Sequence, residues 1–230
     1  MSLQIILNSA NSLQINRRKL IGVQYTRNQL PRTSQTPTYN PWRFTVTLPN
    51  LFQYSQVRTL LEEIDLLDRN TPQEFTLSES GKLDWMFAYQ GTLSLAQRNQ
   101  ITYYAFNENQ LQLNVSAVTG ATSGDYVVRK GDFIQVENKP YPFTSLTDVF
   151  KGGGSTVTIT THRPNIFSTQ PSAGDSIYFG NAVTWNMFCP NMPTYKLIPG
   201  GAIISGNDVV NNALIEWSDP FQLYEWTAGA

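Results

Sequence analysis

The feature that most constrains this chain is the alternation of apolar and polar residues in many short runs. These runs are rich in Val, Ile, Thr, Tyr, Phe and Trp, and they are separated by Gly, Pro, Asn and Asp. A period of two is typical of strands that bury one face. In Trp42–Leu48, for example, Trp, Phe, Val and Leu share one face, and Arg and Thr share the other. The sequence therefore predicts a mainly β protein.

The clearest strands share this alternation and end at turn-forming residues. With 230 residues, the chain is long enough for one large β domain or two small ones. The predicted strands are Lys19–Thr26, Trp42–Leu48, Gln73–Ser78, Gln110–Val118, Asp132–Glu137, Ser155–His162, Ile177–Phe179, Val183–Phe188, Tyr195–Ile198, Ala202–Ile204, Ala213–Trp217 and Phe221–Trp226.

One segment, residues 51–68, has helical periodicity instead. Its apolar residues recur at spacings of three and four, which predicts a helix with one stripe against a core. Asn50 can cap the start of this helix, and Pro72 ends it. The apolar stripe consists of Tyr54, Val57, Leu60, Leu61, Ile64 and Leu67.

The middle of the chain reads as a second unit, because continuous strands and tight turns follow one another there as in a small barrel. Sequential strands and chain ends often meet in space, so we expect the last strands to complete the sheet that residues 19–48 begin. The expected architecture is a discontinuous β domain of residues 1–91 and 190–230, with residues 92–189 inserted as a small β-barrel domain.

The composition favours a surface that contacts other proteins. Only 14% of the residues are charged, against roughly 25% in an ordinary soluble domain, while 12% are aromatic. Surfaces poor in charge and rich in aromatic residues are typical of protein interfaces. The balance of 16 basic and 17 acidic residues gives no reason to expect a nucleic-acid or membrane partner. We find neither a secretion signal at the start nor a run long enough to span a membrane.

The predicted helix carries acidic residues in its second half, where the helix macrodipole disfavours negative charge. The simpler interpretation is a solvated acidic face that Arg58 and Arg69 partly compensate. The alternative is a subunit contact with a basic run near the start of the chain, where residues 1–50 hold six Lys or Arg and no acid. The candidate interface residues are Arg17, Arg18, Lys19, Glu62 and Glu63.

A long connection is expected at Asn28–Pro41, which contains three prolines and many polar residues. Connections longer than about 12 residues are usually functional or disordered. The sequence leaves two interpretations open here: an arm that reaches a neighbouring subunit, or a mobile solvent loop.

The residues needed for catalysis or metal binding are scarce. The chain has one His and one Cys, so thiolate metal clusters, Cys-His nucleophiles and intrachain disulfides are improbable. His162 ends a strand and precedes Arg163 without a nucleophile motif, which favours a structural histidine. Cys189 is consistent with a reducing compartment. Asp132 is expected to accept backbone hydrogen bonds in a turn. We expect no enzymatic activity, no cofactor and no metal.

The tryptophans allow one alternative function. Together with eleven Tyr they could build a platform on which sugars stack. Most of them alternate with other apolar residues, however, which favours core or interface packing. The five residues are Trp42, Trp85, Trp185, Trp217 and Trp226.

Several segments, taken in their order, resemble tail or baseplate proteins of contractile-tailed, myovirus-type bacteriophages, notably cyanophages. The resemblance spans nearly the whole chain, and the order of the pieces is more specific than any single one. The segments are Asn8 to Leu13, Asn16 to Arg18, Trp42 to Thr47, Leu67 to Arg69, Lys130 to Gln135, Tyr141 to Phe143, Thr161 to Pro164 and Gly180 to Val183.

This resemblance implies a structural virion protein with a tail-tube-like β-sandwich or barrel and one packed helix. It implies other tail or baseplate proteins as partners, a homo-oligomeric ring, and assembly in the host cytoplasm before residence in the virion. No catalytic motif comes with it. The alternative is a carbohydrate-binding β module of a phage host-recognition protein.

Overall fold

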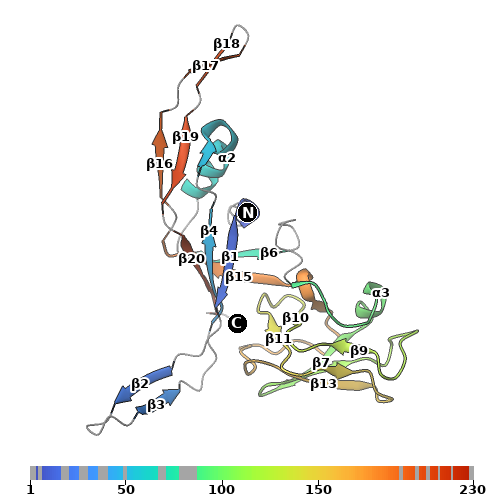
Figure 1. Ribbon diagram of the computed structural model, residues 1–230. Coiled ribbons are helices and arrows are strands. Elements are labelled where there is room, and N and C mark those ends of the chain that lie inside the picture. Colours follow the sequence, from blue (N-terminus) through green and yellow to red (C-terminus); the bar gives the residue numbers. More distant parts are fainter. Residues whose placement is uncertain are drawn as a thin grey trace.

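The fold is taken from a computed structural model of the chain (Figure 1). The structure describes residue 4 and residues 7–16, 21–25, 31–35, 41–48, 51–66, 71–77, 87–191, 194–199, 202–205, 208–211, 213–218 and 220–227.

The centre of the molecule is an antiparallel sheet of five strands. Its inner face follows the predicted alternation, because β4 buries Phe44 and Val46 while β20 buries Phe221 and Leu223. Phe221 lies opposite Val46, which confirms that the last strand completes a sheet begun early in the chain. The order is β1 (Ser12–Asn16), β4 (Arg43–Thr47), β20 (Phe221–Glu225), β15 (Thr184–Phe188) and β6 (Gln73–Thr76).

A three-stranded sheet extends from the central sheet toward the top of Figure 1. It consists of β5 (Leu51–Gln53), β19 (Leu214–Trp217) and β16 (Tyr195–Ile198), and α2 (Tyr54–Asp65) follows β5 directly. The predicted helix of residues 51–68 was thus placed too early, because the backbone of residues 51–53 pairs with β19 as a strand.

The apolar stripe of α2 is confirmed at one residue. Leu61 is buried in the same cluster as Ile215 and Trp217 of β19. Tyr54, at the start of the helix, is 38% exposed. The side chains of the other stripe residues, Val57, Leu60, Ile64 and Leu67, lie outside the described residues.

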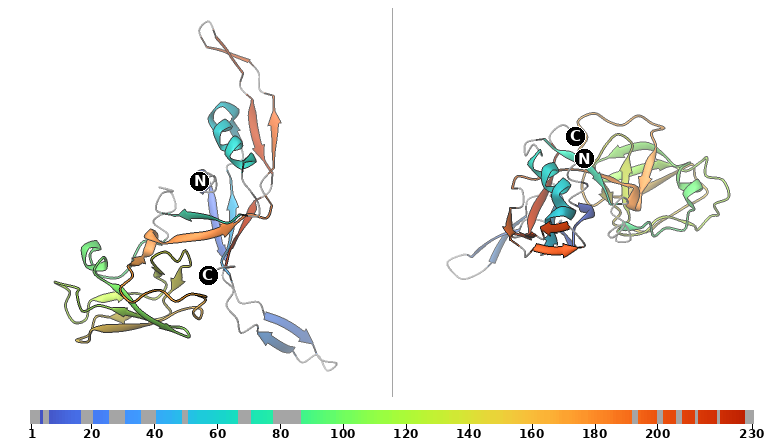
Figure 2. Two further views of the ribbon diagram at one scale, coloured as in Figure 1. Left: turned by 180° about the vertical axis from the view of Figure 1, so that it is seen from behind. Right: turned by 90° about the horizontal axis from the view of Figure 1, so that it is seen from above.

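Two β-ribbons project from this body. The lower ribbon pairs β2 (Ile21–Tyr25) with β3 (Pro31–Gln35), and the upper ribbon pairs β17 (Ala202–Ser205) with β18 (Asp208–Asn211). The upper ribbon continues the β16–β19 hairpin, and Figure 2 shows the lower ribbon standing clear of the rest in two further views. The expected loop at Asn28–Pro41 is therefore wrong for residues 31–35, which form a strand because each of them pairs with a residue of β2.

The residues between β6 and β15 build a separate lobe at the lower right of Figure 1, which we call the middle lobe. The structure describes this lobe from Phe87 onward, and this part contains three small sheets. One sheet consists of β13 (Thr156–Thr160), β8 (Gln110–Asn114) and β7 (Thr102–Asn107). A second consists of β11 (Phe143–Thr144), β10 (Phe133–Val136) and β14 (Ile177–Phe179), and the third pairs β12 (Val149–Phe150) with β9 (Tyr126–Val128).

Two short helical elements belong to this lobe. Helix α3 (Leu95–Arg98) begins with a capping box between Ser94 and Gln97. The 3-10 turn η2 (Gly180–Ala182) leads into β15. Its Gly180 has φ +65, and a Cβ there would lie 2.6 Å from the backbone N of Tyr89, so only glycine allows this close approach.

The middle lobe is not the closed barrel that the sequence predicts. Its sheets meet through single bridges, one between Thr102 and Ser176 and one between Ser145 and Thr161. The strands are short, and register shifts interrupt two of the pairings, so the hydrogen-bond ladder does not continue around the lobe. The described residues are mainly β, with several sheets and no closed barrel.

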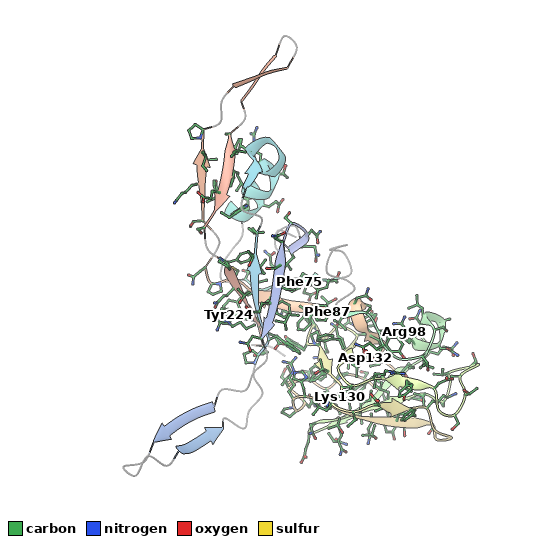
Figure 3. The ribbon with its side chains drawn as sticks, viewed as in Figure 1. Phe75, Phe87, Arg98, Lys130, Asp132 and Tyr224 are labelled. Atoms are coloured by element: carbon green, nitrogen blue, oxygen red, sulfur yellow. The ribbon has the colours of Figure 1, made fainter. Side chains whose placement is uncertain are left out.

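The buried apolar residues form two clusters. In the first, beside the central sheet, the ring of Trp185 lies 5.1 Å from that of Trp42 and 4.9 Å from that of Phe44. The second fills the middle lobe. Phe87 and Phe133 of the lobe belong to the first cluster, so apolar packing ties the lobe to the central sheet (Figure 3). The domain boundaries drawn from the sequence stay a prediction.

Candidate functional site

A buried ion pair joins the middle lobe to the central sheet. Arg163, which follows β13, donates from Nη1 to Glu225 Oε2 at 2.6 Å and from Nη2 to Glu225 Oε1 at 2.7 Å. Glu225 is the last residue of β20, and the two side chains are 1% and 0% exposed. The planar guanidinium matches the two carboxylate oxygens, which makes this the strong, directional form of an ion pair.

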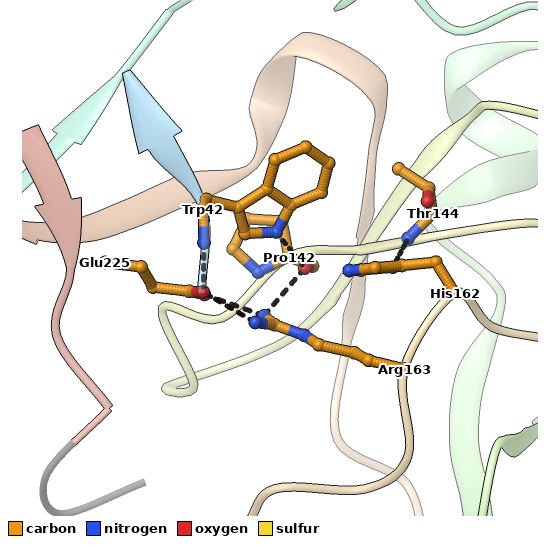
Figure 4. A network of polar contacts seen from close by, with 6 residues as sticks. All are labelled: Trp42, Pro142, Thr144, His162, Arg163 and Glu225. Atoms are coloured by element: carbon orange, nitrogen blue, oxygen red, sulfur yellow. Dashed lines mark hydrogen bonds and ion pairs between the residues drawn. The ribbon is translucent and has the colours of Figure 1, made fainter. Parts of the chain in front are cut away.

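Backbone groups from two further segments complete the surroundings of this pair (Figure 4). The backbone N–H of Trp42, just before β4, donates to Glu225 Oε2 at 3.0 Å. The carbonyl of Pro142 accepts from Arg163 Nη2 at 3.0 Å and from the indole Nε1 of Trp42 at 3.4 Å. The guanidinium carbon lies 4.9 Å from the ring centre of Phe143. Four separate segments therefore meet at this junction.

The sequence contains a signal for this pair that our sequence analysis missed. Phe221, Leu223 and Glu225 alternate along β20, so the carboxylate occupies the buried face. A buried carboxylate without a partner is costly, and such a position therefore calls for a cation. The identity of the partner was not readable, because Arg163 lies 62 residues away in sequence.

His162 has the structural role that the sequence predicts. Its Nδ1 accepts from the backbone N–H of Thr144 at 2.9 Å, and its own backbone N–H donates to the Thr144 carbonyl at 3.0 Å. The imidazole centre lies 5.1 Å from the ring of Trp42 and 6.3 Å from that of Phe143. Because Nδ1 accepts, the neutral ring carries its proton on Nε2. The junction thus includes the histidine as a packing and hydrogen-bonding element.

Of the five candidate interface residues, the structure describes only two. Glu62 of α2 accepts from Arg58 Nε at 3.2 Å, with both side chains more than half exposed, so the predicted compensation by Arg58 is confirmed. A pair this exposed contributes little stability. Glu63 is partly exposed. Outside the described residues lie Arg17, Arg18, Lys19 and Arg69. The subunit contact stays a prediction.

The two ribbons are candidates for contacts with other molecules. Within the described part of the chain, each is a sheet of only two strands. A two-stranded ribbon is marginally stable in water by itself. In the upper ribbon, the central cross-strand pairs are Ile203 with Val210 and Ile204 with Val209. An apolar ribbon that projects from the body is typical of a surface that another chain covers.

Strand β16 continues this apolar character toward the body of the molecule. It lies at the edge of its sheet, and Leu197 and Ile198 are 56% and 38% exposed. An edge strand offers unpaired backbone groups together with its side chains. The upper ribbon and the edge strand β16 are therefore two neighbouring candidates for contact with another chain.

The tryptophans mostly pack inside the protein, as the alternation predicts. Trp42, Trp185 and Trp217 are at most 8% exposed, and Trp226 packs against Phe188 with ring centres 5.3 Å apart. Three of the five indoles are therefore closed to a sugar. Trp85 lies outside the described residues.

Asp132 organises a turn, which confirms the prediction for this residue. Its Oδ1 accepts from the Gln90 N–H at 2.9 Å and its Oδ2 from the Arg129 N–H at 2.8 Å. Burial raises the pKa of the carboxyl, and these hydrogen bonds oppose that change. Nearby, the hydroxyl of Tyr89 lies 2.7 Å from the Val127 carbonyl and donates to it. Burial raises the pKa of Tyr89 to about 12. Both side chains hold the start of the lobe in place.

A half-open cleft of about 430 Å³ lies where the central sheet meets the three-stranded sheet. Thr47 and Leu48 line it at the end of β4, Lys196 lines it from β16, and Glu216 and Trp217 line it from β19. None of the described residues that line it is a His or Cys.

Among the described residues, no group of three or more His, Cys, Asp or Glu side chains could hold a metal ion. None of the described helices has the length and apolar character needed to cross a membrane. No protein-family model matches the chain, and no curated protein matches it.

Proposed function

We propose that this chain is a structural subunit of a contractile bacteriophage tail, in the baseplate, the hub or the ring at the end of the tail tube. It assembles there with other tail proteins and with copies of itself. The upper ribbon carries this proposal, because a two-stranded ribbon is at best marginally stable by itself and its central cross-strand pairs are aliphatic. The order of the sequence segments described above supports the choice of a phage tail.

In this proposal the central sheet, the three-stranded sheet and α2 form the tube-like domain, which takes in residues 1–91 and 190–230. The middle lobe is the inserted domain of residues 92–189. The subunit works by binding, without catalysis or a cofactor, and it resides in the virion after assembly in the host cytoplasm.

The composition supports contacts of a neutral kind. With 14% charged residues, the chain has few ion pairs to place between subunits. The ribbons supply hydrogen-bonding backbone edges and aliphatic residues instead. The alternative, a carbohydrate-binding module, loses its main support because Trp42, Trp185 and Trp217 are buried.

Self-association tests the proposal directly. We would compare the wild-type chain with a variant in which a two-residue Asn-Gly turn replaces residues 200–212, by sedimentation velocity and negative-stain microscopy. The wild type is expected to form rings or larger oligomers, and the shortened variant is expected to stay monomeric with an unchanged melting temperature. A matched control removes Gly153 from the turn between β12 and β13, where the structure leaves open space.

The same measurements can also contradict the proposal. If the wild-type chain stays monomeric at all concentrations and in mixtures with tail proteins, the structural proposal is wrong. Retention on a glycan array under the same conditions would then favour the carbohydrate-binding alternative.

A further inference from the structure

The central sheet ends at the edge strand β6, where a side chain from the start of the chain contacts the strand backbone. We propose that Gln4 covers this edge: its amide takes the place of a neighbouring strand at Thr76 and keeps a strand of a second copy of the chain from extending the sheet. This role is a property of the fold and does not depend on the function proposed above.

The backbone groups of Thr76 point away from the sheet, as its pairing with β15 shows. Thr76 lies opposite Thr184, whose backbone N–H donates to the Gln135 side chain instead of to β6. In an antiparallel pair of this kind, neither residue bonds to the other, and both turn their N–H and carbonyl outward. Because the pattern repeats every second residue, the backbone of Glu74 faces the same edge.

The Gln4 amide reproduces the hydrogen bonds that a strand would make. Its Oε1 accepts from the Thr76 N–H at 2.9 Å, and its Nε2 donates to the Thr76 carbonyl at 2.9 Å. One residue of an antiparallel neighbour exchanges this same pair of bonds with the residue opposite. A primary amide carries an acceptor and a donor side by side, so one side chain satisfies both backbone groups. Gln4 thus occupies the position of a sixth strand.

Gln4 is held in this position by its own helical turn, which also contains Leu7 and Asn8. Leu7 is 1% exposed and belongs to the core cluster beside the central sheet. The Nε2 of Gln4 also donates to Asn8 Oδ1 at 3.0 Å, one turn further along. The Gln4 side chain is 7% exposed, and its oxygen and its nitrogen both have partners. A buried and paired side chain of this kind has a defined position.

The unpaired edge of a sheet is a template for a strand of another chain. Each copy of this protein carries such a strand in β16, where Leu197 and Ile198 are exposed at a sheet edge. A second copy is therefore a ready source of a strand for β6. With Thr76 covered by Gln4, the remaining residue of β6 whose backbone faces outward is Glu74, which is exposed and charged. A charged residue at an edge further disfavours pairing.

Hydrogen exchange at the Thr76 amide tests this role, because it reports on the β6 edge alone. The test variant is Gln4→Leu, which keeps the approximate size of the side chain and removes the amide. In the wild type, we expect Thr76 to stay protected at every protein concentration. In dilute Gln4→Leu, its protection factor should fall by about tenfold, because the N–H loses its acceptor.

As the concentration of Gln4→Leu is raised, protection of Thr76 should return, because a strand of a second copy then supplies the acceptor. Sedimentation velocity over the same range should show larger species than in the wild type. If Gln4→Leu does not fold, Gln4→Ala removes the same amide with less apolar surface and has the same expected results.

The matched control is Gln14→Leu. Gln14 is exposed on β1, the opposite edge of the same sheet, so this variant adds the same apolar side chain and leaves Gln4 in place. It should sediment like the wild type and keep Thr76 protected. Because the Thr76 amide reads β6 whether or not the chain assembles through its upper ribbon, a failure of the proposed function would not imitate a failure of this inference.

Two results would overturn the inference. One is a Thr76 amide that stays protected in dilute Gln4→Leu, because Gln4 would then not be the group that covers the edge. The other is a loss of protection that does not return at any concentration, because an edge without Gln4 would then take up no strand of a second copy.

Discussion

The Arg163–Glu225 pair places two full charges in surroundings almost without water. Removing both charges of a buried pair is often nearly neutral, whereas removing one leaves the other uncompensated. The two side chains are also oriented by backbone groups: the Trp42 N–H donates to Glu225, and the Pro142 carbonyl accepts from Arg163. Each charged side chain therefore depends on the other for its position and its compensation.

We predict that Arg163→Met or Glu225→Met alone lowers the free energy of unfolding by about 3–5 kcal/mol. The double variant Arg163→Met, Glu225→Met should be more stable than the sum of the single losses implies, since it leaves no unpaired charge. Chemical denaturation of the four proteins measures this coupling. Strictly additive losses would show that the two charges do not depend on each other.

The raised pKa of Tyr89 predicts that the protein loses stability at alkaline pH. Its pKa is raised from 10.0 to about 12 because the buried hydroxyl disfavours ionisation. The resulting stabilisation is complete below pH 10, where Tyr is protonated in both the folded and the unfolded chain, and it is lost as the pH rises through about 12. The Tyr89→Phe variant should lack this loss. Thermal melts of both proteins between pH 9 and about 12 test it, and parallel curves would contradict it.

At the level of elements, helix α2 contributes Leu61 to the buried cluster that also contains Ile215 and Trp217 of β19. Leu61 is 4% exposed, whereas Leu66, one turn further on, is 79% exposed. Leu61→Ala should therefore lower the free energy of unfolding by about 2–5 kcal/mol. Leu66→Ala is the matched control and should change it by less than about 0.5 kcal/mol. Equal denaturation midpoints for the two variants would mean that the stripe faces a partner instead of the core.

The acidic face of α2 allows a test of the proposed subunit contact. Reversal of Glu62 and Glu63 to Lys, or of Arg17 and Arg18 to Glu, should each impair assembly and leave the melting temperature of the monomer unchanged. Charges across an interface fix orientation and partner choice, so combining both reversals should partly restore assembly. Reversal of Glu62 also breaks the exposed Arg58–Glu62 pair, but such a pair contributes little to the free energy of unfolding. Its loss should therefore leave the melting temperature of the monomer almost unchanged. Normal assembly of both reversed variants would identify a solvated face.

At the scale of the whole molecule, the low charge content predicts how subunits meet. In the tail assembly proposed above, each contact of this subunit should bury more than about 1,000 Å² and contain few ion pairs. A cryo-electron microscopy map of the intact tail would show whether the upper ribbon and β16 lie in such a contact. Small interfaces built mainly from ion pairs would contradict the argument from composition.

Much of the strand pattern could be predicted, because alternation is a local property. Ile177–Phe179 forms β14 as expected, and β4, β15 and β20 lie within their predicted ranges. The lower ribbon was missed in part because Pro31 and the polar residues of β3 resemble a loop, and only pairing with β2 makes them a strand. The shift of the helix start has the same origin, since residues 51–53 pair with β19.

Local sequence patterns were enough to predict the mainly β character, the helix that follows β5, the burial of Trp42 and the turn at Asp132. Each depends on residue type and spacing within a few neighbouring residues. The pairing of the strands, the absence of a closed barrel in the middle lobe and the contact of Arg163 with Glu225 beside His162 became visible only in the folded chain. Those outcomes depend on contacts between residues far apart in the chain, and the free energy of such contacts is set by burial and geometry that no local pattern contains.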